Sequence, residues 1–204
     1  MSVSALPIIG FDTETHLITP TSVRPPLVCG TFAGGKDTLE TVFGFIEHHD
    51  LTHHNSLFLM GEDTVVADVE WELLLDKTMT LEFIVFALDK VRFAAHHQVF
   101  DWWVIVNEMP DLLPVVASML EQGRLACTKV REMLWCIAND KFKFDDRTGK
   151  KKPGMFSLAA LSAVYFDEDL AALKKGPDVW RLRYAELDGV PIYMWPEAAS
   201  FYAI

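Results

Sequence analysis

The sequence predicts a mixed α/β domain, in which a sheet formed early in the chain is covered by the helices that follow it. Apolar, β-branched segments dominate the first half of the chain, whereas apolar residues at helical spacing dominate the second half. The length of 204 residues is sufficient for one domain with a sizeable core. We therefore expect residues 1–204 to form a single α/β unit.

Strands are expected where short apolar runs are bounded by turn residues or loops. A polar, histidine-rich loop separates the second and third of these runs. The segments at 57–60 and 64–69 are expected to form either one strand or a strand pair. The predicted strands are Ile8–Asp12, Leu27–Ala33, Leu57–Met60 with Thr64–Val69, and Val91–Ala95.

Helices are expected where apolar residues recur every three or four positions, as at Val130, Met133, Leu134 and Ile137. Proline and glycine residues delimit several of these segments. The predicted helices are Glu70–Asp76, Leu81–Lys90, Phe100–Glu108, Leu112–Gln122, Thr128–Asn139, Ser157–Tyr165, Val179–Leu187 and Pro196–Tyr202.

The net charge of −11 argues against a domain that reads DNA sequence, because such domains are usually basic. It does not exclude a nuclease, since a carboxylate site recruits divalent cations to meet a phosphate. Basic residues do cluster between Lys141 and Lys152. That cluster has two interpretations that the sequence leaves open, a phosphate-facing groove or a solvated loop.

The sequence indicates a cytoplasmic protein. No apolar run is long enough to span a membrane, and the first residues lack the features of a signal peptide. Cys29, Cys127 and Cys136 have no metal-binding spacing and are expected to be buried, reduced thiols.

Two acidic residues follow the first apolar strand. Asp12 and Glu14 project from the same face, because side chains alternate along a strand. Neighbouring carboxylates repel each other unless a cation lies between them. The segment therefore predicts either a metal site or a strand that simply becomes polar as it reaches solvent.

A third carboxylate lies in a comparable position. Asp101 follows the strand-like residues 91–95 and falls in the first turn of an apolar helix, where its charge favours the positive end of the helix dipole. Alone, this is an ordinary residue for the start of a helix. Together with Asp12 and Glu14, it supplies three hard oxygen ligands, which suit Mg²⁺ or Mn²⁺ and do not suit zinc.

These residues resemble the motifs of the DnaQ-like 3′–5′ exonucleases. Residues 12–15 (Asp-Thr-Glu-Thr) resemble the first motif of that superfamily, and His97-x-x-Phe100-Asp101 is similar to the second. Residues 156–161 and 176–197 look like late segments of the exonuclease domain of family A DNA polymerases, most like bacteriophage members. The family usually has asparagine at the position of His97.

The resemblance implies a ribonuclease-H-like fold, with a mixed five-stranded sheet and helices on both faces. It also implies proofreading-type hydrolysis of terminal phosphodiesters of DNA, with two Mg²⁺ or Mn²⁺ ions held by Asp12, Glu14 and Asp101. The implied partner is the 3′ end of single-stranded DNA, in the cytoplasm of a phage-infected bacterial host. The residues implied to bind substrate are Thr13, Thr15, His16, Leu17, His97 and Phe100.

The family's last motif, a tyrosine with an aspartate one helical turn later, has two candidate positions here. Tyr184 and Asp188 match the letters, but Asp188 precedes Gly189 and Pro191 and so lies at a helix end. Tyr202 matches the family's surroundings better, and we favour it as the catalytic tyrosine. The motif's aspartate would then lie beyond Ile204, in a polymerase domain or another downstream polypeptide.

Two rival functions are compatible with the same residues. One is a catalytically inert or truncated exonuclease-like domain that binds single-stranded nucleic acid or a replication partner. The other is a nuclease that acts on RNA or short oligonucleotides, which differ from DNA at the terminal sugar by the 2′-hydroxyl.

Overall fold

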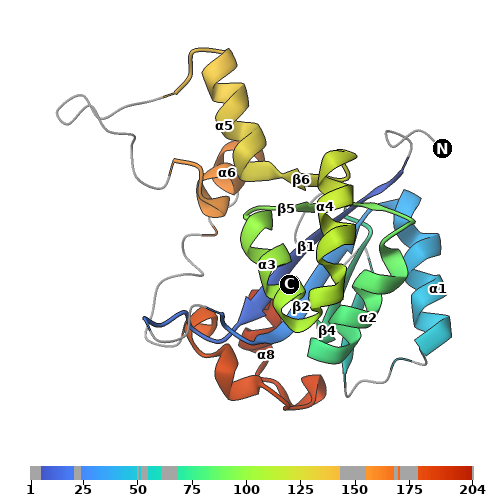
Figure 1. The fold of residues 1–204 in the computed structure, drawn as a ribbon. Helices are drawn as coiled ribbons and strands as arrows, with labels where there is room; N and C mark the ends of the chain where they lie inside the picture. The colour runs from blue at the N-terminus through green and yellow to red at the C-terminus, as the bar shows by residue number, and fades with distance from the viewer. Residues whose placement is uncertain are drawn as a thin grey trace.

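A computed structural model describes residues 6–20, 24–49, 51, 55–60, 69–142, 155–167, 170 and 179–203. Its centre is a mixed sheet with the strand order β3-β4-β2-β1-β5-β6 (Figure 1). The central strands β1 and β2 are antiparallel, as are β2 with β4 and β3 with β4, whereas β5 and β6 run parallel to β1. The strands are β1 (Ile8–Thr15), β2 (Leu27–Gly34), β3 (Ser56–Met60), β4 (Trp71–Asp76), β5 (Arg92–Ala95) and β6 (Leu125–Cys127).

The α/β class is confirmed, but the expected number of strands is wrong, because the described residues contain six rather than five. The expectation of a helix at Glu70–Asp76 is also wrong, since β4 occupies these positions. The run Leu73-Leu74-Leu75 is buried on both faces of the sheet, so it lacks the alternation that marks a half-buried strand. Of the predicted segment Thr64–Val69, only Val69 lies within the described residues.

Seven α-helices lie within the described parts of the chain, and most begin close to the predicted positions. The sequence analysis did not identify α1. Short 3₁₀ turns replace the helix expected at Val179–Leu187. The helices are α1 (Leu39–His49), α2 (Lys77–Ala87), α3 (Gln98–Glu108), α4 (Leu113–Glu121), α5 (Thr128–Ala138), α6 (Leu158–Tyr165) and α8 (Glu197–Ala203), and the 3₁₀ turns are η2 (Lys36–Thr38), η4 (Pro110–Leu112), η5 (Trp180–Leu182), η6 (Tyr184–Leu187) and η7 (Ile192–Met194).

Side chains capping two of the helices explain where these helices begin. The Asp76 side chain accepts a hydrogen bond from the backbone N–H of Met79 at the start of α2. The Ser157 side chain accepts one from the N–H of Ala160 at the start of α6. Each cap pairs a backbone donor that the helix itself leaves without an acceptor.

The main core lies between one face of the sheet and helices α1, α2 and α3. Phe32 of β2 packs against Phe83 of α2, with 4.5 Å between ring centroids, and Phe83 also contacts Phe45 of α1. On the β1 side, Phe11 contacts Trp102 of α3. These side chains are nearly or fully buried, so this layer supplies much of the apolar burial that stabilises the fold.

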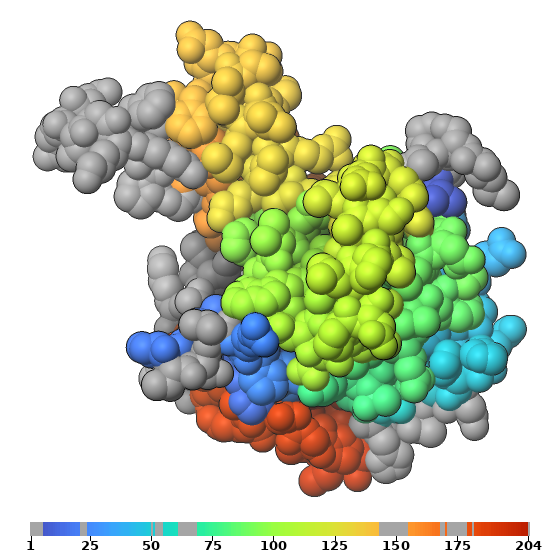
Figure 2. Space-filling model, viewed as in Figure 1, coloured from blue at the N-terminus to red at the C-terminus, as the bar shows by residue number. Residues whose placement is uncertain are grey.

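A second, smaller core covers the opposite face of the sheet. Leu74 of β4 and Cys29 of β2 are fully buried there against residues of the C-terminal segment, including Tyr184, Trp195 and Ala199. In Figure 1 this segment is red and runs along the lower edge of the molecule to α8. Figure 2 shows that α5, in yellow, stands out from the body of the molecule. The two cores together confirm that both faces of the sheet are covered.

Candidate functional site

The acidic residues of β1 lie on the sheet face that the C-terminal segment partly covers. Ile9, Phe11 and Thr13 point into the opposite, main-core side and are buried, so Gly10, Asp12 and Glu14 alternate toward the smaller core. Asp12 is exposed and Glu14 is partly buried. Both residues therefore face a common space, as the alternation of a strand requires.

The structure brings Asp101 next to Asp12. Asp101 lies in the first turn of α3 and is only 2% exposed. Its Oδ1 accepts a hydrogen bond of 2.8 Å from the hydroxyl of Thr13, and it shares a further hydrogen bond with Asp12. Burial and the charge of Asp12 together raise the pKa of Asp101 to about 8. Asp101 therefore retains its proton more readily than an ordinary aspartate does.

Glu14 extends the acidic region toward the smaller core. It lies opposite Cys29 in the β1–β2 ladder. Burial raises the pKa of the Cys29 thiol well above its usual value, and Glu14 and Asp12 add to the effect. The pKa of Tyr184 is raised mainly by burial and then by Glu14. Because these groups influence one another's pKa values, the four residues lie close together: Asp12, Glu14, Cys29 and Tyr184.

The carboxyl groups are suitable metal ligands in type, but they do not form a complete metal-binding group. No set of three or more His, Cys, Asp or Glu side chains within the described residues is close enough together to hold an ion. Asp12 and Asp101 are in contact, and Glu14 faces the same space. Two of the three expected ligands, Asp12 and Asp101, are therefore in contact in the structure.

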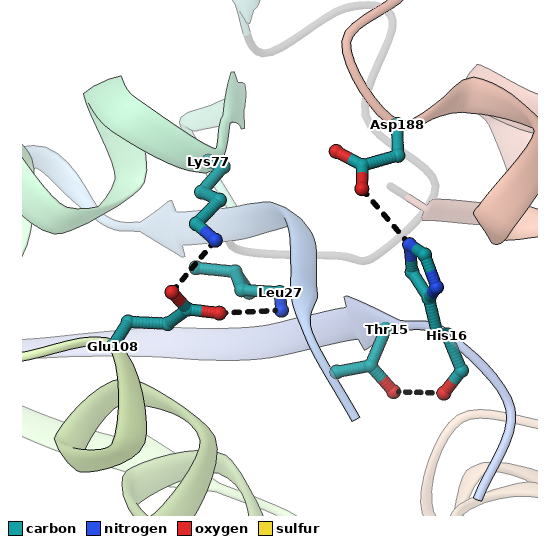
Figure 3. A network of polar contacts seen from close by, with 6 residues as sticks. All are labelled: Thr15, His16, Leu27, Lys77, Glu108 and Asp188. Carbon is teal, nitrogen blue, oxygen red and sulfur yellow. Dashed lines mark hydrogen bonds and ion pairs between the residues drawn. The ribbon is translucent and has the colours of Figure 1, made fainter. Parts of the chain in front are cut away.

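Asp188 is paired with His16, the residue that follows β1. Its Oδ2 lies 2.9 Å from Nε2 of His16, and both side chains are partly exposed (Figure 3). Tyr184, the tyrosine of the same sequence match, is fully buried, and its hydroxyl donates to the backbone oxygen of Ala199. Tyr202, in contrast, lines the same cavity as Asp12 and Glu14. Of the two candidate tyrosines, Tyr202 is therefore the one that lines the cavity.

The remaining substrate-binding candidates differ in their contacts. The Thr13 side chain is buried against Asp101, so it orients that carboxyl group. The Thr15 hydroxyl donates to the backbone oxygen of His16 (Figure 3). Leu17 is exposed. At the start of α3, His97 is the N-cap, although its side chain makes no capping hydrogen bond. Its ring stacks on that of Phe100, with 6.5 Å between centroids.

A salt bridge and a hydrogen bond fix the opposite end of α3. Oε2 of Glu108 lies 2.6 Å from Nζ of Lys77, the first residue of α2, and its Oε1 accepts from the backbone N–H of Leu27 (Figure 3). One carboxylate thus joins α3, α2 and the start of β2. Because Asp101 lies on the same helix, this junction helps to hold it against β1.

A cavity of about 1020 Å³ opens beside the acidic residues of β1. Gly10 and Ala33 are paired across β1 and β2, and the absence of a side chain at Gly10 and the small methyl group of Ala33 leave space above the sheet. Helices α5, α6 and α8 contribute walls that are largely apolar. Among the lining residues on these helices are Leu134, Trp135, Leu158, Leu161, Phe201 and Tyr202.

The sequence analysis missed Glu72, which also lines this cavity. Glu72 lies on β4 and is 5% exposed, and burial raises its pKa to about 7. Its Oε2 has no hydrogen-bond partner within the part of the chain that the structure describes. A glutamate inside the apolar run 71–75 was the available signal, but interpreting this segment as a helix hid which face the side chain occupies.

A scan against protein-family models, a search of curated proteins and a search of solved structures found no match. None of the described helices is long and apolar enough to cross a membrane.

Proposed function

We propose that this chain is a metal-dependent 3′–5′ exonuclease that hydrolyses terminal phosphodiesters of DNA, of the proofreading type associated with DNA polymerases. The observation that carries the proposal is geometric. Asp101, almost fully buried at the start of α3, is in contact with Asp12 beside a large cavity. Burying Asp101 next to a second acid is unfavourable, and a divalent cation would offset this cost.

The fold supports the same proposal. A mixed sheet with helical segments on both faces is what the resemblance to ribonuclease-H-like domains implies. The described sheet has six strands rather than the expected five. Asp12 lies on β1, and Asp101 lies in the first turn of α3, which follows β5, so the two acids meet beside the paired strands β1 and β5.

Asp12, Glu14 and Asp101 are the residues that would hold Mg²⁺ or Mn²⁺. Bound there, the ions would activate water and stabilise the leaving 3′ oxygen. Thr13 would keep Asp101 oriented through its hydrogen bond. Tyr202, which lines the cavity together with Asp12, would position the attacking water. The apolar walls of the cavity would hold the bases at the 3′ end of the strand.

The first test is the release of 3′ nucleotides from labelled single-stranded DNA in Mn²⁺ or EDTA. We expect Mn²⁺-dependent release that falls at least a hundredfold in Asp12→Ala and in Asp101→Asn, because each change removes a ligand oxygen. Asp111→Ala is the matched control, since Asp111 is an exposed acid in η4. Absence of release from folded wild-type protein would overturn the proposal that this chain acts alone.

A second function is favoured by two observations. The described residues contain no complete metal-binding group, and Asp188 is paired with His16. An inert domain that binds single-stranded nucleic acid would have these features. Thermal unfolding of the same samples separates the two functions. An active domain becomes more stable as Mn²⁺ is titrated, and this gain is lost in Asp101→Asn. An inert domain shows no gain in wild type or in Asp101→Asn. Competition between DNA and RNA 3′ ends then tests the choice of sugar.

A further inference from the structure

Glu72 occupies an unusual position for an acidic side chain. It is 5% exposed on β4, which is separated from β1 by β2, yet one of its carboxyl oxygens has no partner among the described residues. Burial without a compensating hydrogen bond is unfavourable for a carboxyl group, whether ionised or neutral. A structural role would require a partner within the fold. Glu72 also lines the cavity beside β1, so its carboxyl group lies where a bound ligand would be.

The strand register shows what lies between Glu72 and the acidic pair. Glu72 pairs with Ala33, which pairs with Gly10, and Asp12 is two residues further along β1. Side chains at these paired positions point to the same face of the sheet. Glu72 and Asp12 are therefore roughly 12 Å apart at Cα, given two strand spacings of about 4.8 Å and two residues of about 3.4 Å.

Gly10 and Ala33 form the floor of the cavity between these two acids. A Cβ added at Gly10 would have only the Ala33 backbone oxygen nearby, at 3.7 Å, so the space above it is open. The distance from Asp12 to Glu72 is comparable to the length of one nucleotide from its phosphate to the far edge of its base. A nucleotide with its phosphate at Asp12 would place its base over this floor, with Glu72 at the far end.

The walls of the cavity suit a nucleobase. Trp135 of α5 and Phe201 and Tyr202 of α8 line it, and two of them, Trp135 and Phe201, are about half exposed. Aromatic side chains of this kind stack on bases. The volume of about 1020 Å³ is at the upper end of the range of roughly 300–1,000 Å³ typical of small-molecule sites.

We propose that Glu72 is a base-recognition residue, whose carboxyl group accepts hydrogen bonds from the N–H groups of a nucleobase in this cavity. The inference rests on the proposed function for the class of ligand, DNA. Guanine offers adjacent imino and amino donors on one edge, so it is the base best matched to a carboxylate. The pKa of about 7 allows the ionised form at slightly alkaline pH.

The test measures binding rather than hydrolysis. Deoxyguanosine 5′-monophosphate is titrated into the full chain in Mn²⁺ at pH 8, with 2-deoxyribose 5-phosphate as a probe without a base. We expect Glu72→Leu to lower the affinity for the nucleotide at least tenfold and Glu72→Gln to lower it less. The affinity for the sugar phosphate should stay unchanged. Glu70→Gln is the matched control, since Glu70 precedes β4 and forms an ion pair with Lys36.

Three results would overturn the inference. The wild type does not bind the nucleotide, Glu72→Leu binds it as tightly as the wild type does, or Glu72→Leu loses affinity for both probes equally. The last result would mean that the cavity itself had changed shape. Failure of the exonuclease proposal is distinguishable, because it appears as absent release from labelled DNA while Glu72-dependent nucleotide binding persists. Glu72→Leu should fold, because leucine needs no hydrogen-bond partner at a buried position.

Discussion

Two acidic side chains, one on α3 and one on β4, are buried in different surroundings. Asp101 is enclosed by the start of α3 and has both Thr13 and Asp12 as partners. Glu72 is enclosed by β4 and its neighbours and has one oxygen without a partner. A carboxyl group that lacks a partner raises the free energy of the folded state when it ionises, so Glu72 should make the stability of the protein depend on pH.

The sign of this dependence follows from the direction of the pKa shift. Burial raises the pKa of Glu72 from 4.5 to about 7, so the folded state binds its proton more tightly than the unfolded state does. The contribution of Glu72 to stability is complete below pH 4.5 and is lost as the pH rises through 7. In Glu72→Gln, which cannot ionise, we expect the loss of stability between pH 4.5 and pH 8 to be smaller by about 3 kcal/mol.

Urea unfolding in EDTA at several pH values measures this difference. EDTA is needed because a bound cation would change the ionisation of the other acids. Arg131, Glu132, Asp12 and Glu14 line the same cavity and remain in both proteins, so the comparison isolates Glu72. Equal pH profiles for wild type and Glu72→Gln would show that water in the cavity solvates the carboxylate.

At the scale of elements, the close approach of α2 to the sheet depends on a glycine. A Cβ added at Gly30 of β2 would lie 2.5 Å from Cγ2 of Thr80 on α2 and 2.9 Å from its Oγ1. Thr80 is fully buried, and its hydroxyl donates to the backbone oxygen of Leu75, so it has little freedom to move. The fit between this helix and this strand therefore requires the absence of a side chain at Gly30.

Gly30→Ala should destabilise the protein by about 1–3 kcal/mol, the usual cost of overpacking a core. Gly10→Ala is the matched control, since Gly10 is also a strand glycine and its added Cβ would make only an ordinary contact. Chemical denaturation of the two variants gives the comparison. A similar free energy of unfolding in both would mean that α2 moves away from the sheet without cost.

At the scale of the whole molecule, the C-terminal segment completes the site by packing on the second face of the sheet. Tyr184 is central to this packing, because it is fully buried and bonded to Ala199 of α8. Its ring lies 6.3 Å from that of Tyr202, which lines the cavity. The two tyrosines thus have different tasks, one in holding α8 and the other at the cavity.

Replacing each tyrosine by phenylalanine separates these tasks. Tyr184→Phe should cost about 1 kcal/mol of stability, the value of one buried hydrogen bond. Tyr202→Phe should lower Mn²⁺-dependent nucleotide release at least tenfold with a smaller loss of stability. Parallel unfolding and release assays measure both quantities. The reverse pattern would assign the catalytic tyrosine to residue 184 and contradict the preference for Tyr202.

The sequence by itself determined the α/β class, most helix positions and the acidic pair on β1. Local patterns carry this information: alternation puts Asp12 and Glu14 on one face, and helical spacing identifies α5. It also led to the expectation that Asp101 begins a helix near Asp12, and the structure brings the two together. These inferences depend on neighbours in the chain, which a sequence displays directly.

Only the tertiary structure decided the positions that depend on distant partners. β4 is a strand because β2 and β3 pair with it on both sides, and its sequence alone resembles a buried helix segment. The pairing of Asp188 with His16 joins residues that the sequence analysis had placed in separate motifs. Glu72 faces the cavity because strand pairing fixes the register of β4 against β2 and β1. Such hydrogen bonds between distant segments cannot be derived from the order of residues alone.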